Sequence, residues 1–147
     1  MPMITLHPVT KENWYACTEL QVTSTQAAIF PVPVVYWLAE SKVEPSYHPM
    51  AIYVDDTLVG FLVYGIDPDD GEYWLIALLI DAQYQRRGYG KAAINALVER
   101  LKTTYLCQRI WVGHRPANSA AAGLYAALGF VLTHVATDGE IIRCLTL

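Results

Sequence analysis

Charge and long apolar stretches are both scarce in this sequence. Charged residues make up only 16% of its 147 residues, although hydrophobic residues make up 54%. The longest uninterrupted apolar run, Tyr73 to Ile80, is far shorter than the ~18 residues of a membrane-spanning helix. The first residues lack a basic segment followed by an apolar one, so we expect no signal peptide. The length fits a single domain over residues 1–147, and we expect no contact with a membrane.

Cysteine and histidine are few and scattered. The three cysteines, Cys17, Cys107 and Cys144, form no metal-binding spacing with one another or with histidine. We therefore expect neither a disulfide framework nor a bound metal, and we expect a reducing, cytoplasmic location. The histidines, including His114, are interpreted as surface or loop residues. The net charge of −4 argues against a nucleic-acid partner and suits a cationic or neutral substrate.

The hydrophobic pattern predicts one mixed α/β (α+β) sheet with helices on its faces. Strands are expected at residues 4–7, 50–54, 58–64, 72–81, 109–112, 130–135 and 141–147, and helices at residues 11–20, 34–41, 90–105 and 118–128. The run from Trp74 to Ile80 does not alternate with polar residues, which is typical of a strand covered on both faces. That strand is therefore expected at the centre of the sheet.

A glycine-containing loop connects this central strand to the next helix. Its residues are Gln85, Arg86, Arg87, Gly88, Tyr89, Gly90 and Lys91. The first turn of a helix offers unpaired N–H groups and the positive end of the helix dipole, and glycines let a ligand approach the backbone. The basic side chains add positive charge to an otherwise acidic protein. Together these features predict a site for a diphosphate, although the loop alone is equally typical of an ordinary glycine-rich turn.

Two well-known diphosphate-binding loops fit this segment poorly. A P-loop needs a wider glycine spacing and a hydroxyl residue after the lysine, whereas Ala92 follows Lys91. A dinucleotide-binding loop is the closer rival, because Gly88 to Ala93 satisfies its GxGxxA pattern. The acidic residue that binds the ribose about 20 residues further on is missing, since residues 107–109 are Cys, Gln and Arg. A dinucleotide site is therefore the remote alternative.

The loop resembles the Q/R-x-x-G-x-G/A signature of the GNAT superfamily of acyl-CoA-dependent N-acyltransferases, with Gln85, Gly88 and Gly90 at the signature positions. The segment from Asn118 to Phe130 is similar to the N-x-x-A-x-x-L-Y-x-x-x-G-F pattern near the C-terminus of many members. The expected order of strands and helices also matches the family over essentially the whole chain. The resemblance implies a mostly antiparallel sheet of about seven strands flanked by about four helices. It also implies that the loop amides hold acetyl-CoA, and that a homodimer can form through the strands at residues 141–147.

The resemblance implies roles for residues outside the loop as well. In the family, the backbone at the end of the central strand pairs with the pantetheine arm, and here that end is Leu78, Leu79 and Ile80. Tyr125 falls where the family's general-acid tyrosine falls; core packing is the alternative. A phenol with a pKa of about 10 stays protonated at neutral pH and can protonate a departing thiolate. Asn118 is expected to cap its helix and, by resemblance, to touch the cofactor.

The base that deprotonates the acceptor amine is expected on the central strand. Glu72, at the start of that strand, is the candidate, and simple alternation places it on one face with Trp74, Leu78 and Ile80. Many family members carry a glutamate on this strand, at a position nearer to Trp74. A solvated residue after the acidic turn is an equally good interpretation of Glu72.

Acidic and aromatic residues in the N-terminal half are candidates for binding a cationic acceptor. They are Glu12, Tyr36, Glu40 and Tyr47, with the amide of Gln26 in the same half and Trp74 from the central strand. Such groups attract a cation by charge and by cation–π contact. Parts of the sequence are similar to bacterial spermine/spermidine acetyltransferases, which implies a polyamine or another small primary amine as acceptor. Acetylation of a peptide, an amino acid or an aminoglycoside is the alternative within enzymes, and a non-catalytic CoA-binding module is the alternative outside them.

Overall fold

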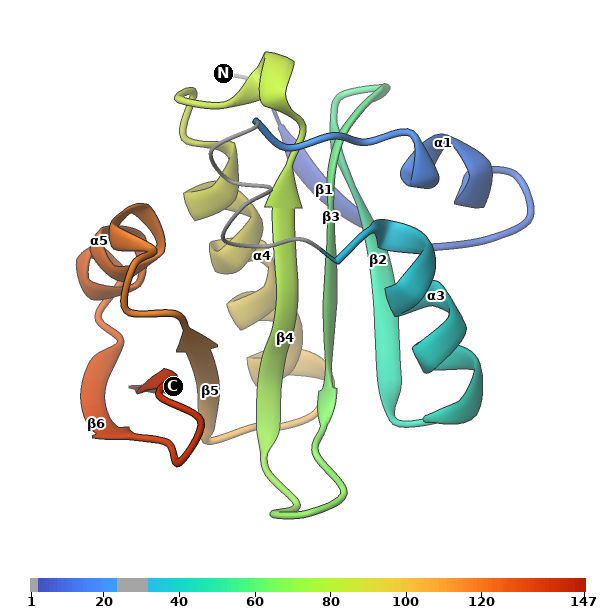
Figure 1. Ribbon diagram of the computed structural model, residues 1–147. Coiled ribbons are helices and arrows are strands. Elements are labelled where there is room, and N and C mark those ends of the chain that lie inside the picture. The colour runs from blue at the N-terminus through green and yellow to red at the C-terminus, as the bar shows by residue number, and fades with distance from the viewer. Residues whose placement is uncertain (1–2, 24–31) are drawn as a thin grey trace.

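The computed structural model describes residues 3–23 and 32–147 (Figure 1). Its strands are β1 (Ile4–Pro8), β2 (Tyr47–Val54), β3 (Thr57–Ile66), β4 (Tyr73–Ile80), β5 (Arg109–His114), β6 (Val131–Val135) and β7 (Ile141–Thr146); its helices are α1 (Trp14–Thr18), α3 (Val34–Val43), α4 (Tyr89–Thr104) and α5 (Ser119–Ala127). The strands form one sheet in the order β1-β2-β3-β4-β5-β7-β6, antiparallel except between β4 and β5. The predicted fold class is confirmed, and β4 lies at the centre of the sheet as its apolar run predicts.

Helices cover both faces of the sheet. On one face, called the α3 face, Cys17 of α1 and Val34 of α3 pack against Phe61 and Val63. On the other, called the α4 face, Leu97 of α4 packs in a second core that also holds residues of α5. Figure 1 shows α4 running behind β4 and α5 beside β5. Within the two described ranges, no helix combines the length and the apolar character needed to cross a membrane.

The first helix is shorter than its sequence predicts. A helix was expected over residues 11–20, but α1 begins at Trp14. The Asn13 side chain accepts a hydrogen bond from the Thr10 N–H at 2.8 Å, and the Thr10 hydroxyl accepts one from the Glu12 N–H at 3.3 Å. These local side-chain bonds hold residues 10–13 in a turn and so replace the first helical turn.

The sheet opens between β4 and β5. The two strands pair in parallel only at Trp74–Trp111 and Leu75–Val112. Directly after this pairing, β4 contains one extra residue, because β3 pairs Tyr64 with Leu75 but Val63 with Ala77. The extra residue is Ile76, so a β-bulge stands where the two strands part.

The bulge changes which β4 side chains share a face. Leu75 lies in the α4-face core, whereas Ala77 lies in the α3-face core, although simple alternation would put both on one side. The expectation that Glu72 shares a face with Leu78 and Ile80 is therefore wrong, since these two pack on the α4 face. The extra residue at the bulge reverses the alternation.

The C-terminal strand β7 is an internal strand. It pairs with β5 on one side and β6 on the other, so both of its edges are occupied. The expectation that the strand at residues 141–147 pairs between two chains is wrong for that reason, because only an edge strand offers unpaired backbone groups. A homodimer through another surface stays a prediction.

Candidate active site

The loop after β4 is held in place by its own side chains. The carboxylate of Asp81 is buried, with 8% of its surface exposed, and accepts hydrogen bonds from the N–H groups of Gln21 at 3.0 Å and Gln83 at 3.1 Å. The Gln85 side chain donates to the Ile80 carbonyl at 2.8 Å. The predicted signature residue Gln85 therefore closes the loop against the end of β4, which fixes where α4 begins.

The start of α4 has the features of an anion site. Gly88 is the N-cap residue, with φ of +79°, and no side chain caps the helix. This left-handed conformation strains any residue with a Cβ atom, which explains the glycine. Among residues 3–23 and 32–147, no atom outside the neighbouring residues of the chain lies within 4 Å of the place where a Cβ of Gly88 would stand. The first N–H groups of α4, at Tyr89, Gly90 and Lys91, lack partners within the helix and can receive phosphate oxygens.

The arginines of the loop frame this helix end. Arg87 donates to the Gln83 carbonyl at 3.4 Å, and its guanidinium lies 5.7 Å from the centre of the Tyr84 ring. Arg86 adopts a left-handed backbone with φ of +64°. Together with Lys91 on the exposed side of α4, they place positive charge around the helix N-terminus.

The opening between β4 and β5 exposes backbone groups of β4. The Asp81 N–H donates to the Val59 carbonyl of β3 at 2.8 Å. Since the hydrogen-bonding direction alternates along a strand, Leu79 also faces β3, while Leu78 and Ile80 face the opening. The Ile80 carbonyl is already bound by Gln85. Three residues are predicted to pair with a pantetheine arm. Of these, Leu78 points its backbone N–H and carbonyl into the opening, and Ile80 points its N–H there.

Tyr125 reaches the same opening from α5. Only 7% of its surface is exposed, and its ring lies between those of His114 at 6.1 Å and Phe130 at 5.6 Å. In the described chain, the Tyr125 hydroxyl is not a buried polar atom without a hydrogen-bond partner. Burial, and then the negative charge of Glu140, raises the pKa of Tyr125 to about 12. The phenol is therefore protonated at neutral pH and can donate a proton.

His114 belongs to this site, although its sequence context suggested a surface or loop residue. It ends β5 and is 6% exposed. Its Nδ1–H donates to the Arg115 carbonyl at 3.0 Å, and its Nε2 accepts from Nε of Arg143 at 3.1 Å. Both ring nitrogens are thereby engaged, so His114 holds a fixed orientation against the Tyr125 ring. In the sequence, the only sign of its burial is the alternation of buried residues along β5, in which His114 follows Ile110 and Val112 at steps of two.

Asn118 caps α5, as predicted. Its side-chain oxygen accepts a hydrogen bond from the Ala121 N–H at 3.1 Å. Contact with the cofactor remains a prediction for this residue.

Replacing Asn118 with alanine removes this cap, and we expect a loss of about 1 kcal/mol in the free energy of unfolding. Urea denaturation of the purified protein measures the loss. Asn118→Asp keeps an accepting oxygen and serves as the matched control, which should remain close to the original stability. Equal stability of the alanine variant would show that the cap contributes nothing.

Glu72 makes contacts that favour a structural role. It precedes β4 at the end opposite to the loop, where its carboxylate forms an ion pair with Arg109 and accepts a hydrogen bond from the Trp111 indole at 3.1 Å. Both partners belong to β5, so Glu72 ties β4 to β5 below the opening. A carboxylate bound in this way is a weaker candidate for a base than one with no partner.

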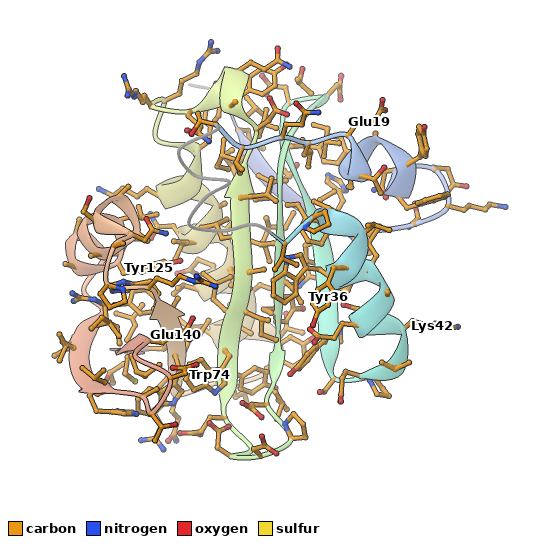
Figure 2. The ribbon with its side chains drawn as sticks, in the orientation of Figure 1. Glu19, Tyr36, Lys42, Trp74, Tyr125 and Glu140 are labelled. Atoms are coloured by element: carbon orange, nitrogen blue, oxygen red, sulfur yellow. The ribbon has the colours of Figure 1, made fainter. Side chains whose placement is uncertain are left out.

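Acidic and aromatic residues gather on the sheet near the start of β4, where Figure 2 labels Trp74. Tyr47 and Trp74 lie level with each other on either side of Gly65. Burial raises the pKa of Tyr47, and nearby charges at Asp67 and Glu40 raise it further. We call this the acidic aromatic surface; its residues are Glu40, Glu44, Tyr47, Asp67, Asp69, Asp70 and Trp74.

Not every predicted acceptor-binding residue lies on this surface. Glu12 is exposed in the turn before α1, where its N–H donates to the Thr10 hydroxyl. Gln26 lies outside the described residues. The structure thus brings together Glu40, Tyr47 and Trp74, while Tyr36 is exposed on α3 and contacts the ring of Trp37.

Known proteins with similar sequences and folds agree with this geometry. The model of the acetyltransferase (GNAT) family matches residues 14–130. Spermine/spermidine N(1)-acetyltransferase of Bacillus subtilis (strain 168) is 33% identical over 133 residues, covering 86% of this chain and 87% of that protein. Ribosomal protein bS18-alanine N-acetyltransferase of Salmonella typhimurium is 31% identical over 84 residues, covering 57% of this chain and 55% of that protein.

A solved structure shows the same fold. Spermidine N-acetyltransferase from Vibrio cholerae, in complex with CoA and spermine, has a TM-score of 0.78 at 13% identity and covers 98% of this chain and 95% of that one. The family resemblance predicted from the loop and the segment at 118–130 is confirmed. The chain therefore belongs to the acetyltransferase (GNAT) family, and it is an N-acetyltransferase that uses acetyl-CoA.

Proposed function

We propose that this protein transfers the acetyl group of acetyl-CoA to a primary amine of a small polycation of the polyamine type. The observation that carries the proposal is the acidic aromatic surface beside the opening between β4 and β5. The residues around the start of α4 support the use of the cofactor, and the residues of the acidic aromatic surface support the class of acceptor.

On the cofactor side, the residues present fit a diphosphate and a pantetheine arm. The start of α4 at Gly88 has no side-chain cap from the part of the chain that the structure describes, so its N–H groups can bind an anion, with Arg86, Arg87 and Lys91 around it. The β4 backbone at Leu78 faces the opening and offers hydrogen bonds to an amide-containing chain. Tyr125 is the proposed acid that protonates the departing thiolate.

On the acceptor side, carboxylates are crowded without matching cations. Burial, and then the charge of Glu44, raises the pKa of Glu40. Within the described residues, Glu72 forms an ion pair with Arg109, whereas Glu40 and Glu44 form no ion pair with a lysine or an arginine. A surface that crowds negative charge beside Tyr47 and Trp74 gains stability when a polycation binds to it. The 33% identity to a spermine/spermidine acetyltransferase supports the same acceptor class.

An acceptor panel tests this proposal. Acetyl-CoA should raise the melting temperature, because a ligand at about 100 times its Kd adds about 2.7 kcal/mol of stability. Release of free CoA is then measured with spermidine, butylamine, a peptide that begins with alanine, and an aminoglycoside. Turnover of the peptide or the aminoglycoside alone would show that the polyamine assignment is wrong.

We expect kcat/KM for spermidine to exceed that for butylamine by about tenfold, because a second ammonium contact adds about 1.4 kcal/mol. Added salt should shrink this preference, since it screens exposed charges beyond about 10 Å at 0.1 M. Glu40→Gln is the direct test and should reduce the preference for spermidine while leaving the butylamine rate unchanged. An unchanged preference in salt and in this variant would contradict an electrostatic acceptor site.

A further inference from the structure

Two ionisable side chains flank the point where β4 and β5 part. The pairing of these strands ends at Leu75 and Val112, so the next residues, Ile76 and Gly113, stand level at the opening. Tyr125 approaches this point from the α4 face. Glu140, in the turn before β7, approaches it from the α3 face. Figure 2 shows Tyr125 and Glu140 both beside β5.

The carboxylate of Glu140 lies directly on β5. A Cβ atom built on Gly113 would be 2.7 Å from Oε2 of Glu140 and 3.3 Å from Cδ1 of Ile142. Gly113 pairs with Ile142, and both point away from Val112, which is buried in the α4-face core. The Glu140 carboxylate is therefore on the α3 face. It occupies space that only a glycine at position 113 leaves free.

Glu140 is partly buried and has no cation within ion-pairing distance in the described residues. Burial, and then the charge of Asp138 in the same turn, raises the pKa of Glu140, while Arg115 and His114 at the end of β5 act in the opposite direction. The facing group from α5 is the protonated Tyr125. A proton acceptor and a proton donor thus stand on opposite faces of one opening, where one can take a proton from the amine and the other can give a proton to the departing thiolate.

We propose that Glu140 is the general base of the acetyl transfer: its carboxylate receives the acceptor's ammonium group on the α3 face and takes one proton from it. This inference rests on the proposed function and replaces Glu72 in the base role. Glu72 is bound by Arg109 and Trp111, whereas Glu140 is not paired and lies level with the opening.

The proposed step balances in protons and bonds. Glu140 takes one proton from the ammonium, and the neutral amine attacks the thioester carbonyl. The C–N bond forms and the C–S bond breaks, while Tyr125 gives its phenolic proton to the departing thiolate. The second proton lost by the nitrogen restores Tyr125, and Glu140 releases its proton to solvent. The net products are the N-acetylated amine, free CoA and one proton.

Glu140→Gln tests the role, since it removes the charge and keeps the shape. We expect kcat at saturating spermidine to fall by about a hundredfold, a typical contribution of a general base. In the original protein, log kcat/KM should fall as pH drops through the raised pKa of Glu140, because the protonated carboxyl accepts no proton. The variant should lose this acidic limb and keep its affinity for acetyl-CoA. Asp138→Asn, an exposed neighbour that keeps its accepting oxygen, is the matched control and should stay within about threefold.

Gly113→Ala supplies a second test that leaves all charges in place. Its Cβ would displace the Glu140 carboxylate, so we expect kcat to fall by about tenfold. If the effect passes through Glu140, the double variant Gly113→Ala/Glu140→Gln should be no slower than Glu140→Gln alone.

Three results would overturn the assignment. They are a kcat for Glu140→Gln within about threefold of the original, a rise in KM alone with an unchanged pH profile, or additive losses in the double variant. A protein that binds acetyl-CoA but acetylates no amine would instead contradict the proposed function, before the variants are compared.

Discussion

Tyr125→Phe should lower kcat by about a thousandfold, within the range that a single proton donor contributes. Phenylalanine keeps the ring contacts with His114 and Phe130 and removes only the hydroxyl. The departing thiolate then has to take its proton from water. Because burial and the charge of Glu140 raise the pKa of Tyr125 to about 12, its ionisation should cause no loss of activity below about pH 11.

Steady-state kinetics with saturating acetyl-CoA and spermidine measure this loss. The melting temperature should change little, because phenylalanine keeps the ring contacts that Tyr125 makes in the core. Tyr105→Phe is a suitable control, since it loses a 3.3 Å hydrogen bond to Tyr64 and none of the proposed chemistry. A Tyr125→Phe enzyme within about fivefold of the original would assign Tyr125 to core packing alone.

Gly88→Val should weaken acetyl-CoA binding by more than about a hundredfold. A β-branched residue does not tolerate φ of +79°, at a cost above the ~1–2 kcal/mol of an ordinary side chain. The loop then leaves the conformation that aims the first N–H groups of α4 at a diphosphate. Losing two charge-assisted hydrogen bonds, at about 1.5–3 kcal/mol each, accounts for the expected change in Kd.

Isothermal titration with acetyl-CoA measures the affinity, and Gly90→Ala is the matched control. Gly90 has no positive φ, and its Cβ would meet the nearest atom, on Leu124, at 3.6 Å, an ordinary contact. We expect the control to bind within about threefold of the original. Equal weakening by both substitutions would show that bulk in the loop matters and that the conformation of Gly88 does not.

Local sequence patterns were enough to predict most of the framework. The unbroken apolar run at residues 74–80 predicted a central strand, and β4 is central. Asn118 was predicted as a helix cap from its residue type, and it caps α5. Such features depend on a few neighbouring residues, so the sequence carries them directly.

Features that depend on pairing between distant segments were not predictable. The bulge at Ile76 exists only in the register of β4 against β3, and it reversed the faces assigned to the residues after it. The contact of Glu140 with Gly113 joins a turn to a strand 27 residues away, so spacing gave no sign of it. The place of Glu72 on its strand favours a base in the sequence, which gives no sign of its partners Arg109 and Trp111 on β5.

One experiment tests the proposed acetyl transfer to a polyamine most directly. Acetyl-CoA and spermidine are incubated with the purified protein, free thiol is followed over time, and the product is analysed by mass spectrometry. The expected result is one free CoA released for each spermidine that gains a single acetyl group. Binding of acetyl-CoA without release of CoA in the presence of spermidine would contradict transfer to a polyamine at the opening between β4 and β5.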